Sequence, residues 1–441
     1  MLEGLLYGRG RLSANDSLGE TDWPAPASGD PDLVFDLTGA DAPREGAVAP
    51  FFDGAPGDAA RDAALLEGRA PEIELALVAA DGRRTLARGL PAIERPSALR
   101  FGRDAVSSRI ATLALGLASH PQPGAFASPL ASRPPPSALP FFAGALAAAA
   151  ARKLRKLVVH EGHWRIGLRS LKPGDAAEDT LDWRGDPLWQ WARDDRKRYF
   201  ADPFLFEDGG VAYVFCEEFP YATQKGIISV MALDGSGAPG PARPVLERPY
   251  HLSYPVVFRH EGAIFMMPES SANRTLEIYR ADPFPYRWSL DRVVMRDIAI
   301  SDATAFEFAG GWWLTGATND PDTSSWDCLS LFSGAGPLGP WTPSGEGPAL
   351  VDASAARPAG APYRRNGGMW RPAQDCTQGY GSGLALCRID DIRPGVLRQT
   401  VQRRFKPPGG MHTFNASAHF AAIDTVGPRG RYAWIEGMLS S

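Results

Sequence analysis

Acidic side chains occupy matching positions in a repeat that runs through the second half of the chain. Asp202 and Asp302 open two of three similar stretches, and Tyr254 opens the third. Glu217 and Glu269 take the same later position in the first and second stretches. Several carboxylates in one concavity can exchange protons with a substrate or bind the hydroxyl groups of a polyol. The repeat therefore predicts a site for acid–base chemistry or carbohydrate binding.

The elements that would position these residues are β-hairpins. In each stretch, two short apolar runs flank a glycine-bearing turn, which is typical of two antiparallel strands. A hairpin returns to the end at which it began, so Asp202 is expected near Glu217, and Tyr254 near Glu269. The paired runs cover residues 204–206 with 211–216, 256–258 with 264–267, and 305–308 with 312–315.

The three stretches begin about 50 residues apart, a period typical of propeller blades. A fourth unit is expected to begin at Trp370 and a fifth at His412, with residues 164–167 as an outer strand that closes the ring. Blades around one axis would bring the acidic residues to one mouth of a central channel. We therefore predict a mainly β protein with a five-bladed β-propeller over residues 158–441, preceded by a small degenerate α/β domain.

The part of the chain before the propeller divides into three segments. Residues 1–120 contain strand-like and helix-like runs, which indicate the small α/β region. Residues 121–137 are rich in proline and are expected to form a linker. Residues 138–157 read as one helix that ends in basic residues, as the helix dipole favours.

Each proposed catalytic residue has a structural alternative. Asp202 precedes a proline, so it either acts as a base or ends a turn. Glu217 and Glu218 are adjacent and should face opposite sides of a strand, and Glu217 is preferred because it matches Glu269. Asp302 is assigned to the channel by its place in the repeat. Asp202, Glu269 and Asp302 are therefore the predicted catalytic residues.

Five residues are predicted to bind the substrate: Glu217, Tyr254, Arg371, Asp375 and His412. Arg371 is expected to bind an anionic substrate group, to keep a nearby aspartate ionised, or to form an ion pair between blades. Asp375 either lines the site or caps a turn. His412 either lines the channel, neighbours a metal ion or lies in the core. No set of residues has the spacing of a transition-metal site.

Composition excludes several classes of function. The 441 residues carry a net charge of -5 and no recurring basic face, which argues against a nucleic-acid partner. The 4 cysteines include no CxxC pair, so buried thiols are expected rather than a disulfide framework or a zinc site. The sequence shows neither a signal peptide nor a membrane span, and we expect a cytoplasmic protein.

Longer motifs carry a resemblance to a known family. They are Tyr199–Phe204, Phe215–Phe219, Lys225–Ser229, Ser253–Pro255, Met267–Ser270, Trp370–Asp375 and His412–Asn415. These motifs resemble the N-terminal propeller domain of plant glucosamine inositolphosphorylceramide transferases and their bacterial relatives. The resemblance spans roughly residues 155–435. It implies a fold similar to the five-bladed propellers of glycoside hydrolase families 43 and 32. It also implies that a calcium ion in the channel is the one cofactor to consider.

The resemblance implies roles for individual residues. Asp202 matches the catalytic base of the glycoside hydrolases, in the same Ala-Asp-Pro context. Asp302 falls where that family has a glutamate as general acid, and Tyr254 stands where it has a second aspartate. Glu269 or Glu217 is then expected to supply the missing carboxylate.

Other parts of the relatives are not expected to carry over. The glycosyltransferase domain that follows the propeller in the plant proteins has no counterpart here, so the transferase activity is not transferred. Residues 32–38 and 86–93 resemble formyltransferase-like domains. Residues 1–118 contain no histidine, and so they lack an Asn/His/Asp set for formyl transfer. This region is expected to be a structural remnant.

These observations predict a glycoside hydrolase-like protein that acts on a glycan or glycoconjugate. Asp202 would activate water, and Asp302 or Glu269 would protonate the leaving oxygen. The alternative is a non-catalytic glycan-binding or scaffold module in polysaccharide or glycolipid biosynthesis, with a glycosyltransferase as its partner.

Overall fold

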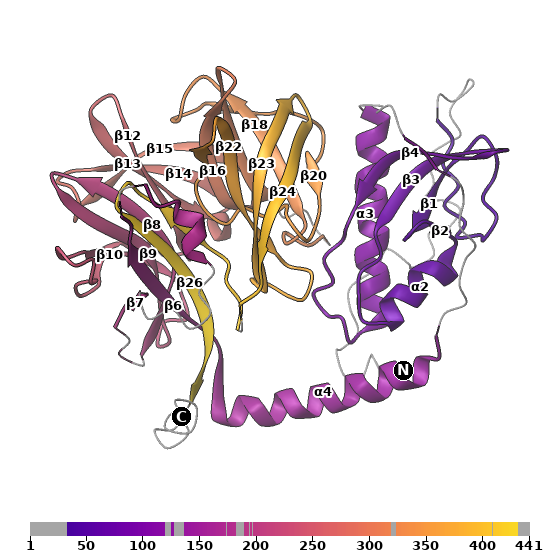
Figure 1. Ribbon diagram of the computed structural model, residues 1–441, viewed down its shortest axis with the longest axis horizontal. Helices are drawn as coiled ribbons and strands as arrows, with labels where there is room; N and C mark the ends of the chain where they lie inside the picture. The colour runs from indigo at the N-terminus through magenta and orange to yellow at the C-terminus, as the bar shows by residue number, and fades with distance from the viewer. Residues whose placement is uncertain are drawn as a thin grey trace.

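The computed structural model describes residues 33–119, 125–127, 136–172, 174–181, 189–193, 195, 197–318, 323–407 and 409–430. Strands dominate these residues, so the predicted mainly β class is confirmed. Figure 1 shows an N-terminal sheet with its helices on one side and a larger set of sheets on the other. No helix among the described residues is long and apolar enough to cross a membrane.

The N-terminal region consists of one sheet with helices packed against it. Its sheet has the order β2-β1-β3-β4-β5, and helices α2 and α3 pack on it. The elements are β1 (Val48–Phe52), β2 (Ala55–Pro56), α2 (Asp58–Leu66), β3 (Ile73–Ala79), β4 (Gly82–Gly89), α3 (Leu99–Ser119) and β5 (Ala125–Ala127). β5 pairs with β4, so three residues of the expected linker extend this sheet, and most of the linker lies outside the described residues. Before β1, the described residues form only an isolated bridge between Phe35 and Val48.

The expected helix over residues 138–157 is α4 (Ala138–Val158). It runs directly into β6 (Val159–Ser170), the first strand of the larger part. Figure 1 shows α4 along the edge of the molecule, between the N-terminal region and β6.

The larger part contains five antiparallel sheets in chain order. The first comprises β8 (Arg198–Asp208), β9 (Val211–Pro220), β10 (Ile227–Ala232) and β11 (Arg243–Leu246). The second comprises β12 (Ser253–His260), β13 (Ala263–Ser270), β14 (Thr275–Ala281) and β15 (Trp288–Arg296), with the short 3-10 helix η3 (Ser271–Asn273) between β13 and β14. The third comprises β16 (Ile300–Phe308), β17 (Gly311–Thr318), β18 (Cys328–Gly334) and β19 (Trp341–Pro343), and β20 (Leu350–Val351) also pairs with β18.

The fourth and fifth sheets complete this part. The fourth comprises β21 (Tyr363–Arg365), β22 (Gly368–Asp375), β23 (Gly383–Arg393) and β24 (Val396–Phe405). The fifth has the order β25-β26-β6-β7, with β25 (Phe414–Ala416), β26 (Phe420–Gly430) and β7 (Gln190–Trp191). Residues 164–167 therefore lie inside this sheet, and β7 is its outer strand. The 3-10 helix η2 (Ala177–Leu181) lies between β6 and β7 in the chain.

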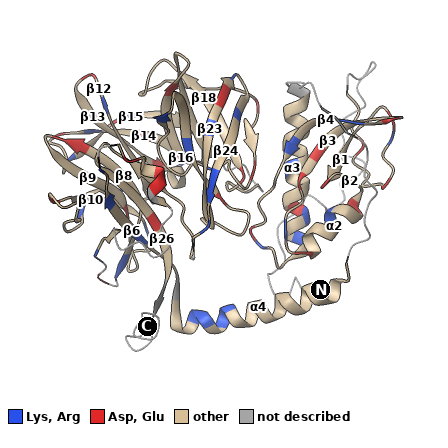
Figure 2. Cartoon of the chain, viewed as in Figure 1, with Lys and Arg blue, Asp and Glu red and all other residues tan. Residues whose placement is uncertain are grey.

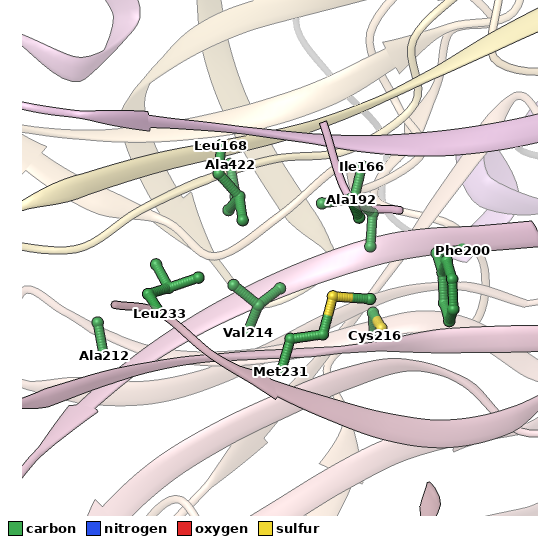
Figure 3. Packing of buried hydrophobic residues seen from close by; sticks show 10 residues of the cluster. All are labelled: Ile166, Leu168, Ala192, Phe200, Ala212, Val214, Cys216, Met231, Leu233 and Ala422. Carbon is green, nitrogen blue, oxygen red and sulfur yellow. The ribbon is translucent and has the colours of Figure 1, made fainter. Parts of the chain in front are cut away.

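The fifth sheet joins two distant parts of the chain. β26 pairs with β6 over most of its length, from Phe420 opposite Ser170 to Gly430 opposite Val159. The space between the fifth and first sheets is filled by an apolar cluster that includes Leu168, Val214 and Met231 (Figure 3). Burying these side chains holds the late strands against the first repeat unit.

The N-terminal region and the third sheet share a buried interface. Arg109 of α3 forms an ion pair with Asp327 at 2.5 Å, and both side chains are buried. Asp327 also accepts a hydrogen bond from the backbone N–H of Ala92 at 2.7 Å. Leu90 forms a parallel bridge with Asp352, next to β20. Backbone pairing and a buried charge pair thus fix this contact.

Candidate functional site

Three equivalent bulges open the first strands of the first three sheets. Asp202, Tyr254 and Asp302 have φ values of 51, 46 and 54, in the left-handed region that non-glycine residues seldom adopt. The register of each strand pair shifts at this residue. A bulge redirects side chains and interrupts the ladder, and strained backbone at one repeated position is typical of functional sites. The three opening residues of the repeat therefore share one backbone geometry.

The backbone N–H at each bulge donates to a carboxylate of the preceding sheet. Asp202 donates to Asp424 Oδ2 at 3.0 Å. Tyr254 donates to Asp202 Oδ2 at 3.2 Å, and Asp302 donates to Glu269 Oε2 at 3.0 Å. Each carboxylate thus joins its own sheet to the next one. These bonds bring acidic groups from the fifth, first, second and third sheets into one connected cluster.

Asp202 lies at the centre of this cluster. Its Oδ1 accepts a hydrogen bond from the Thr413 hydroxyl at 2.8 Å and lies 3.8 Å from His412 Nδ1. Burial raises the pKa of Asp202, and the charges of Asp424 and Glu269 act in the same direction. His412 and the Thr413 hydroxyl oppose the rise. Burial and mutual repulsion thus disfavour the simultaneous ionisation of all carboxyl groups in the cluster.

His412 and Asp424 form a buried pair beside Asp202. His412 Nδ1 lies 2.6 Å from Asp424 Oδ2, and the ring stacks on Trp164 with centroids 3.8 Å apart. Asp424 Oδ1 accepts the backbone N–H groups of His412 and Thr413 at 3.1 and 2.9 Å. Although burial lowers it, the charges of Asp424 and Asp202 raise the pKa of His412. An imidazolium here would balance the buried carboxylates.

The same three groups lie close enough to hold a cation. One ligand atom each from Asp202, His412 and Asp424 lies within 4.8 Å of the others. A calcium ion prefers six to eight oxygen ligands, whereas this set offers two carboxylates and an imidazole. The Nδ1 contact to Asp424 also has the length of a hydrogen bond. The donor set therefore fits a protonated histidine better than a calcium ion.

Asp302 is held by two side chains. Its Oδ2 accepts from Arg357 Nε at 2.6 Å and from Gln374 Nε2 at 3.1 Å. The Arg357 guanidinium also lies over the Tyr380 ring, 5.0 Å from its centroid. Burial raises the pKa of Asp302 to about 7, with repulsion from Glu269 and Asp202 added and the charge of Arg357 opposing. Asp302 is thus poised to change protonation near neutral pH.

Glu217 is the carboxyl group of the cluster with an unsatisfied oxygen. Its Oε1 is buried without a hydrogen-bond partner among the described residues, although His251 Nε2 lies 3.3 Å away. His251 Nδ1 accepts the backbone N–H of Gly226 at 3.0 Å, so the proton of the neutral ring sits on Nε2, facing Glu217. Burial raises the pKa of Glu217 well above its usual range, and repulsion from Asp202 and Glu269 adds to this. Burial and repulsion thus favour the neutral acid form of Glu217 over its carboxylate.

Glu269 is more accessible than its neighbours. It is half-buried, and its Oε1 accepts from Ser271 Oγ at 2.5 Å and Ser301 Oγ at 3.2 Å. The register of the strands matches the predicted one, with Ala201 opposite Glu217 and Ser253 opposite Glu269. The hairpins thus place these glutamates beside the bulges, as expected.

Three of the predicted substrate-binding residues make structural contacts. Tyr254 is buried, and its hydroxyl accepts from Gly360 N at 2.7 Å. Asp375 caps a turn by accepting from Thr377 N at 3.1 Å, and its other oxygen lies 3.2 Å from Lys406 Nζ. Arg371 is bound to backbone carbonyl groups and a glutamine side chain. Its acceptors are the oxygens of Ala355, Ala356 and Pro372, and Gln399 Oε1.

The position of Arg371 differs from the expected one for a topological reason. The sequence places it at the opening of the fourth unit, but Arg371 lies in β22, the second strand of the fourth sheet. The arginine that contacts Asp302 is Arg357, which precedes that sheet. A proline follows both Asp202 and Arg371. This shared feature led to the wrong prediction that β22, like β8, is the first strand of its sheet.

The sequence did not single out Asp424, Arg357 or His251. Asp424 lies in β26 and matches Glu217 and Glu269, because Phe414 pairs with Ile423 just before it. The Phe-Ala-Ala-Ile-Asp run of residues 420–424 is the signal that could have located it. Arg357 and His251 lie outside the strands of the sheets, where a repeat gives no register.

Comparison with known proteins agrees with the motifs of the sequence. Residues 193–405 match the family model described as Glucosamine inositolphosphorylceramide transferase 1, N-terminal. The expected resemblance to this family is confirmed. Glucosamine inositolphosphorylceramide transferase 1 of Oryza sativa subsp. japonica is 32% identical over 198 residues, which are 44% of this chain and 26% of the rice protein. The protein of the same name from Arabidopsis thaliana is 31% identical over 205 residues, 46% of this chain and 27% of the plant protein.

The chain therefore spans about a quarter of the length of these relatives. Solved structures with some likeness include an exo-1,5-α-L-arabinanase from a bovine ruminal metagenomic library. It has 13% identity and a TM-score of 0.37, and the match covers 55% of this chain and all of the arabinanase. An exo-β-1,3-galactanase of Phanerochaete chrysosporium has 12% identity and a TM-score of 0.38, over 50% of this chain and 55% of the galactanase. The fold described above depends on the strand pairing and not on these matches.

Proposed function

We propose that this chain is a carbohydrate-active protein of glycoside hydrolase type, built on a five-bladed propeller that β6 and β26 close. The observation that carries the proposal is the cluster of buried carboxyl groups in which Glu217 Oε1 lacks a hydrogen-bond partner among the described residues and burial raises the pKa of Glu217. The matching relatives are named for glucosamine, an amino sugar, and for inositolphosphorylceramide, a phosphorylated inositol lipid. These names support a glycan or glycoconjugate as substrate.

The cluster divides the chemistry between acid and base. Glu217, kept neutral by burial, would protonate the leaving oxygen of a glycosidic bond. Asp202 would activate water, because Tyr254 N–H, the Thr413 hydroxyl and His412 all stabilise its ionised form. Asp302, with a pKa of about 7, is the second candidate for the acid. Glu269 orients Asp302 through its backbone N–H.

The test measures hydrolysis of a broad panel of aryl glycosides and oligosaccharides. In Asp202→Asn and Glu217→Gln, we expect the rate to fall by about 10²–10⁴, as for loss of a general acid or base. Sugar binding measured by calorimetry should largely survive, because both replacements nearly keep the shape of the side chain.

Glu218→Gln is the matched control. Glu218 is the next residue on β9 and is also buried, but it faces the other side, where it pairs with Arg198 and accepts from Ser229 Oγ at 2.6 Å. Its replacement should change stability and leave the rate within a fewfold of wild type. Equal losses of rate in Glu217→Gln and Glu218→Gln would contradict a catalytic role for Glu217.

A second candidate function is glycan recognition without turnover, in a scaffold that works with a glycosyltransferase. The observation that favours it is the structural use of the carboxylates: Asp202, Glu269 and Asp424 each hold a backbone N–H of the next sheet. Under this alternative, wild type would hydrolyse no member of the panel, and Asp202→Asn would change glycan affinity alone.

A further inference from the structure

Helix α4 is apolar and lies largely in solvent. Only Ala145 is buried along its length, and Figure 1 shows it apart from both the N-terminal helices and the large sheets. Leu139, Leu146, Leu154 and Leu157 expose 79, 51, 67 and 62% of their surface. Exposed leucines at this density are unusual on a helix that contacts water alone.

The exposed leucines share one face of the helix. Leu139, Leu146 and Leu157 follow the spacing that returns to one side of an α-helix, and Leu154 lies just beside them. The less exposed residues, Phe141, Ala145 and Ala149, lie on the side turned toward the rest of the protein. The leucine face is thus an outward stripe over the whole helix.

The charges of the α4 side chains indicate the kind of partner that would bind the leucine stripe. The helix contains Arg152, Lys153, Arg155 and Lys156 and no acidic residue, within a chain whose net charge is -5. In Figure 2 the blue stretches of the α4 ribbon, which mark Lys and Arg, lie in the part of the helix nearest β6. By helical spacing, Arg152 and Arg155 lie on the side opposite the leucines, and Lys153 lies at the edge of the stripe. A leucine face with lysine and arginine on the remaining surface is the pattern of helices that lie in the interface of an anionic membrane. The helix itself does not qualify as a membrane span.

We propose that α4 docks this protein on the surface of an anionic membrane, with the leucine stripe inserted among the acyl chains and the basic residues on the lipid phosphates. Lysine and arginine stems are long enough to reach the headgroups while the helix lies in the interface. The helix is joined directly to β6, so docking fixes the large sheets next to the membrane. This inference does not depend on the proposed hydrolase-like function.

The experiment measures co-sedimentation of the full chain with vesicles. Vesicles of phosphatidylcholine mixed with phosphatidylglycerol should bind wild type, and vesicles of phosphatidylcholine alone should bind it far less. Replacing Arg152, Lys153, Arg155 and Lys156 together by Gln should lower the partition coefficient by about 10²–10³, since each basic residue contributes separately. Raising the salt concentration should weaken binding of wild type as well.

A second variant tests the apolar face. Replacing Leu139, Leu146, Leu154 and Leu157 by Ala keeps a strong helix former at every position and should lower partitioning by about tenfold or more. The matched control is Leu115→Ala on α3, a leucine that is 69% exposed, which should bind as wild type does. Circular dichroism and the melting temperature verify that each variant is folded.

Two outcomes would overturn the proposal. The first is equal binding to both kinds of vesicle that survives the Gln substitutions. The second is failure to bind any vesicle while sedimentation velocity shows a dimer that the Leu→Ala substitutions dissolve, which would assign the stripe to a second copy of this chain.

Discussion

At the scale of single residues, Glu217 differs from the other buried acids because its buried Oε1 accepts no hydrogen bond from the described residues, although His251 Nε2 lies 3.3 Å away. Asp202 and Asp302 each accept at least two hydrogen bonds, whereas Glu217 Oε1 accepts none from the described residues. Burial without compensation favours the neutral acid by the full cost of desolvating a carboxylate. The protonation state of Glu217 should therefore be visible in the stability of the protein.

The first prediction is a pH-dependent effect of Glu217→Gln. The folded protein keeps this proton above the usual pKa of 4.5, so the stability from the neutral acid is complete below that pH and is lost as the pH rises toward the folded-state pKa. Glutamine has no proton to lose. The difference in free energy of unfolding, variant minus wild type, should rise with pH above about 4.5, by up to about 1.4 kcal/mol per pH unit. Urea unfolding from pH 5 to 8 measures it.

Glu218→Gln again supplies the comparison. It removes the partner of Arg198 and Ser229 and should destabilise the protein without a difference that rises in favour of the variant. A flat profile for Glu217→Gln would mean that Glu217 is ionised in the folded protein at neutral pH.

The sequence could predict the residues of the cluster that the repeat fixes. Strand alternation sends Glu217 and Glu218 to opposite sides, and the match to Glu269 selects Glu217. The hairpin register then places Glu217 and Glu269 next to the bulges. The sequence could not identify Arg357 or His251, because both residues lie in loops. The repeat assigns positions to strand residues only. The tautomer of His251 depends on one backbone bond from Gly226, which only the folded structure provides.

At the scale of elements, Asp424 joins β26 to the bulge of β8. It is fully buried and accepts three backbone N–H groups, from Asp202, His412 and Thr413. An asparagine has one acceptor oxygen in place of two, so Asp424→Asn leaves at least one buried N–H without a partner. The second prediction is a loss of about 1–3 kcal/mol in the free energy of unfolding.

Asp234→Asn is the control for this prediction. Asp234 also accepts several backbone N–H groups, from Ser236 at 2.8 Å and Ala238 at 3.0 Å, but in an exposed turn where water replaces a lost partner. Denaturant unfolding of both variants should show the larger loss for Asp424→Asn. A loss at Asp234 that equals or exceeds it would show that burial is not what makes Asp424 important.

The sequence predicts the start of the fifth unit but not the bounds of its long strand. The sequence predicts its start at His412, but it does not single out residues 420–430 as a strand. In the structure, β26 (Phe420–Gly430) already pairs with both β25 and β6. Ala421 and Ala422 have low strand propensity, so a search for aromatic and β-branched runs does not detect this strand, yet both residues are fully buried in the fifth sheet. Tertiary pairing thus overrides local propensity here.

At the scale of the whole molecule, the Arg109–Asp327 pair ties the N-terminal region to the third sheet. The third prediction is that Arg109→Ala costs about 3–5 kcal/mol, because the carboxylate of Asp327 stays buried without its partner. The double variant Arg109→Leu with Asp327→Leu should recover much of this loss, since it buries no unpaired charge. Thermal unfolding monitored separately for the two parts would also show the N-terminal region released first in Arg109→Ala. If the double variant is no more stable than Arg109→Ala, the buried charge is not the cause.

The last prediction concerns the fifth sheet, which pairs strands from far apart in the sequence. The segment that matches the family model, residues 193–405, lacks β6, β7, β25 and β26, which together form the fifth sheet. Without that sheet, the first sheet loses its apolar neighbours Ile166, Leu168 and Ala422, and the Asp202 N–H loses its acceptor. We therefore expect a fragment of residues 193–405 to show no cooperative unfolding in denaturant, whereas a fragment of residues 136–441 retains a cooperative transition. A sharp transition in the shorter fragment, with a midpoint near that of the longer one, would mean that the first four sheets hold together without the strands of the fifth.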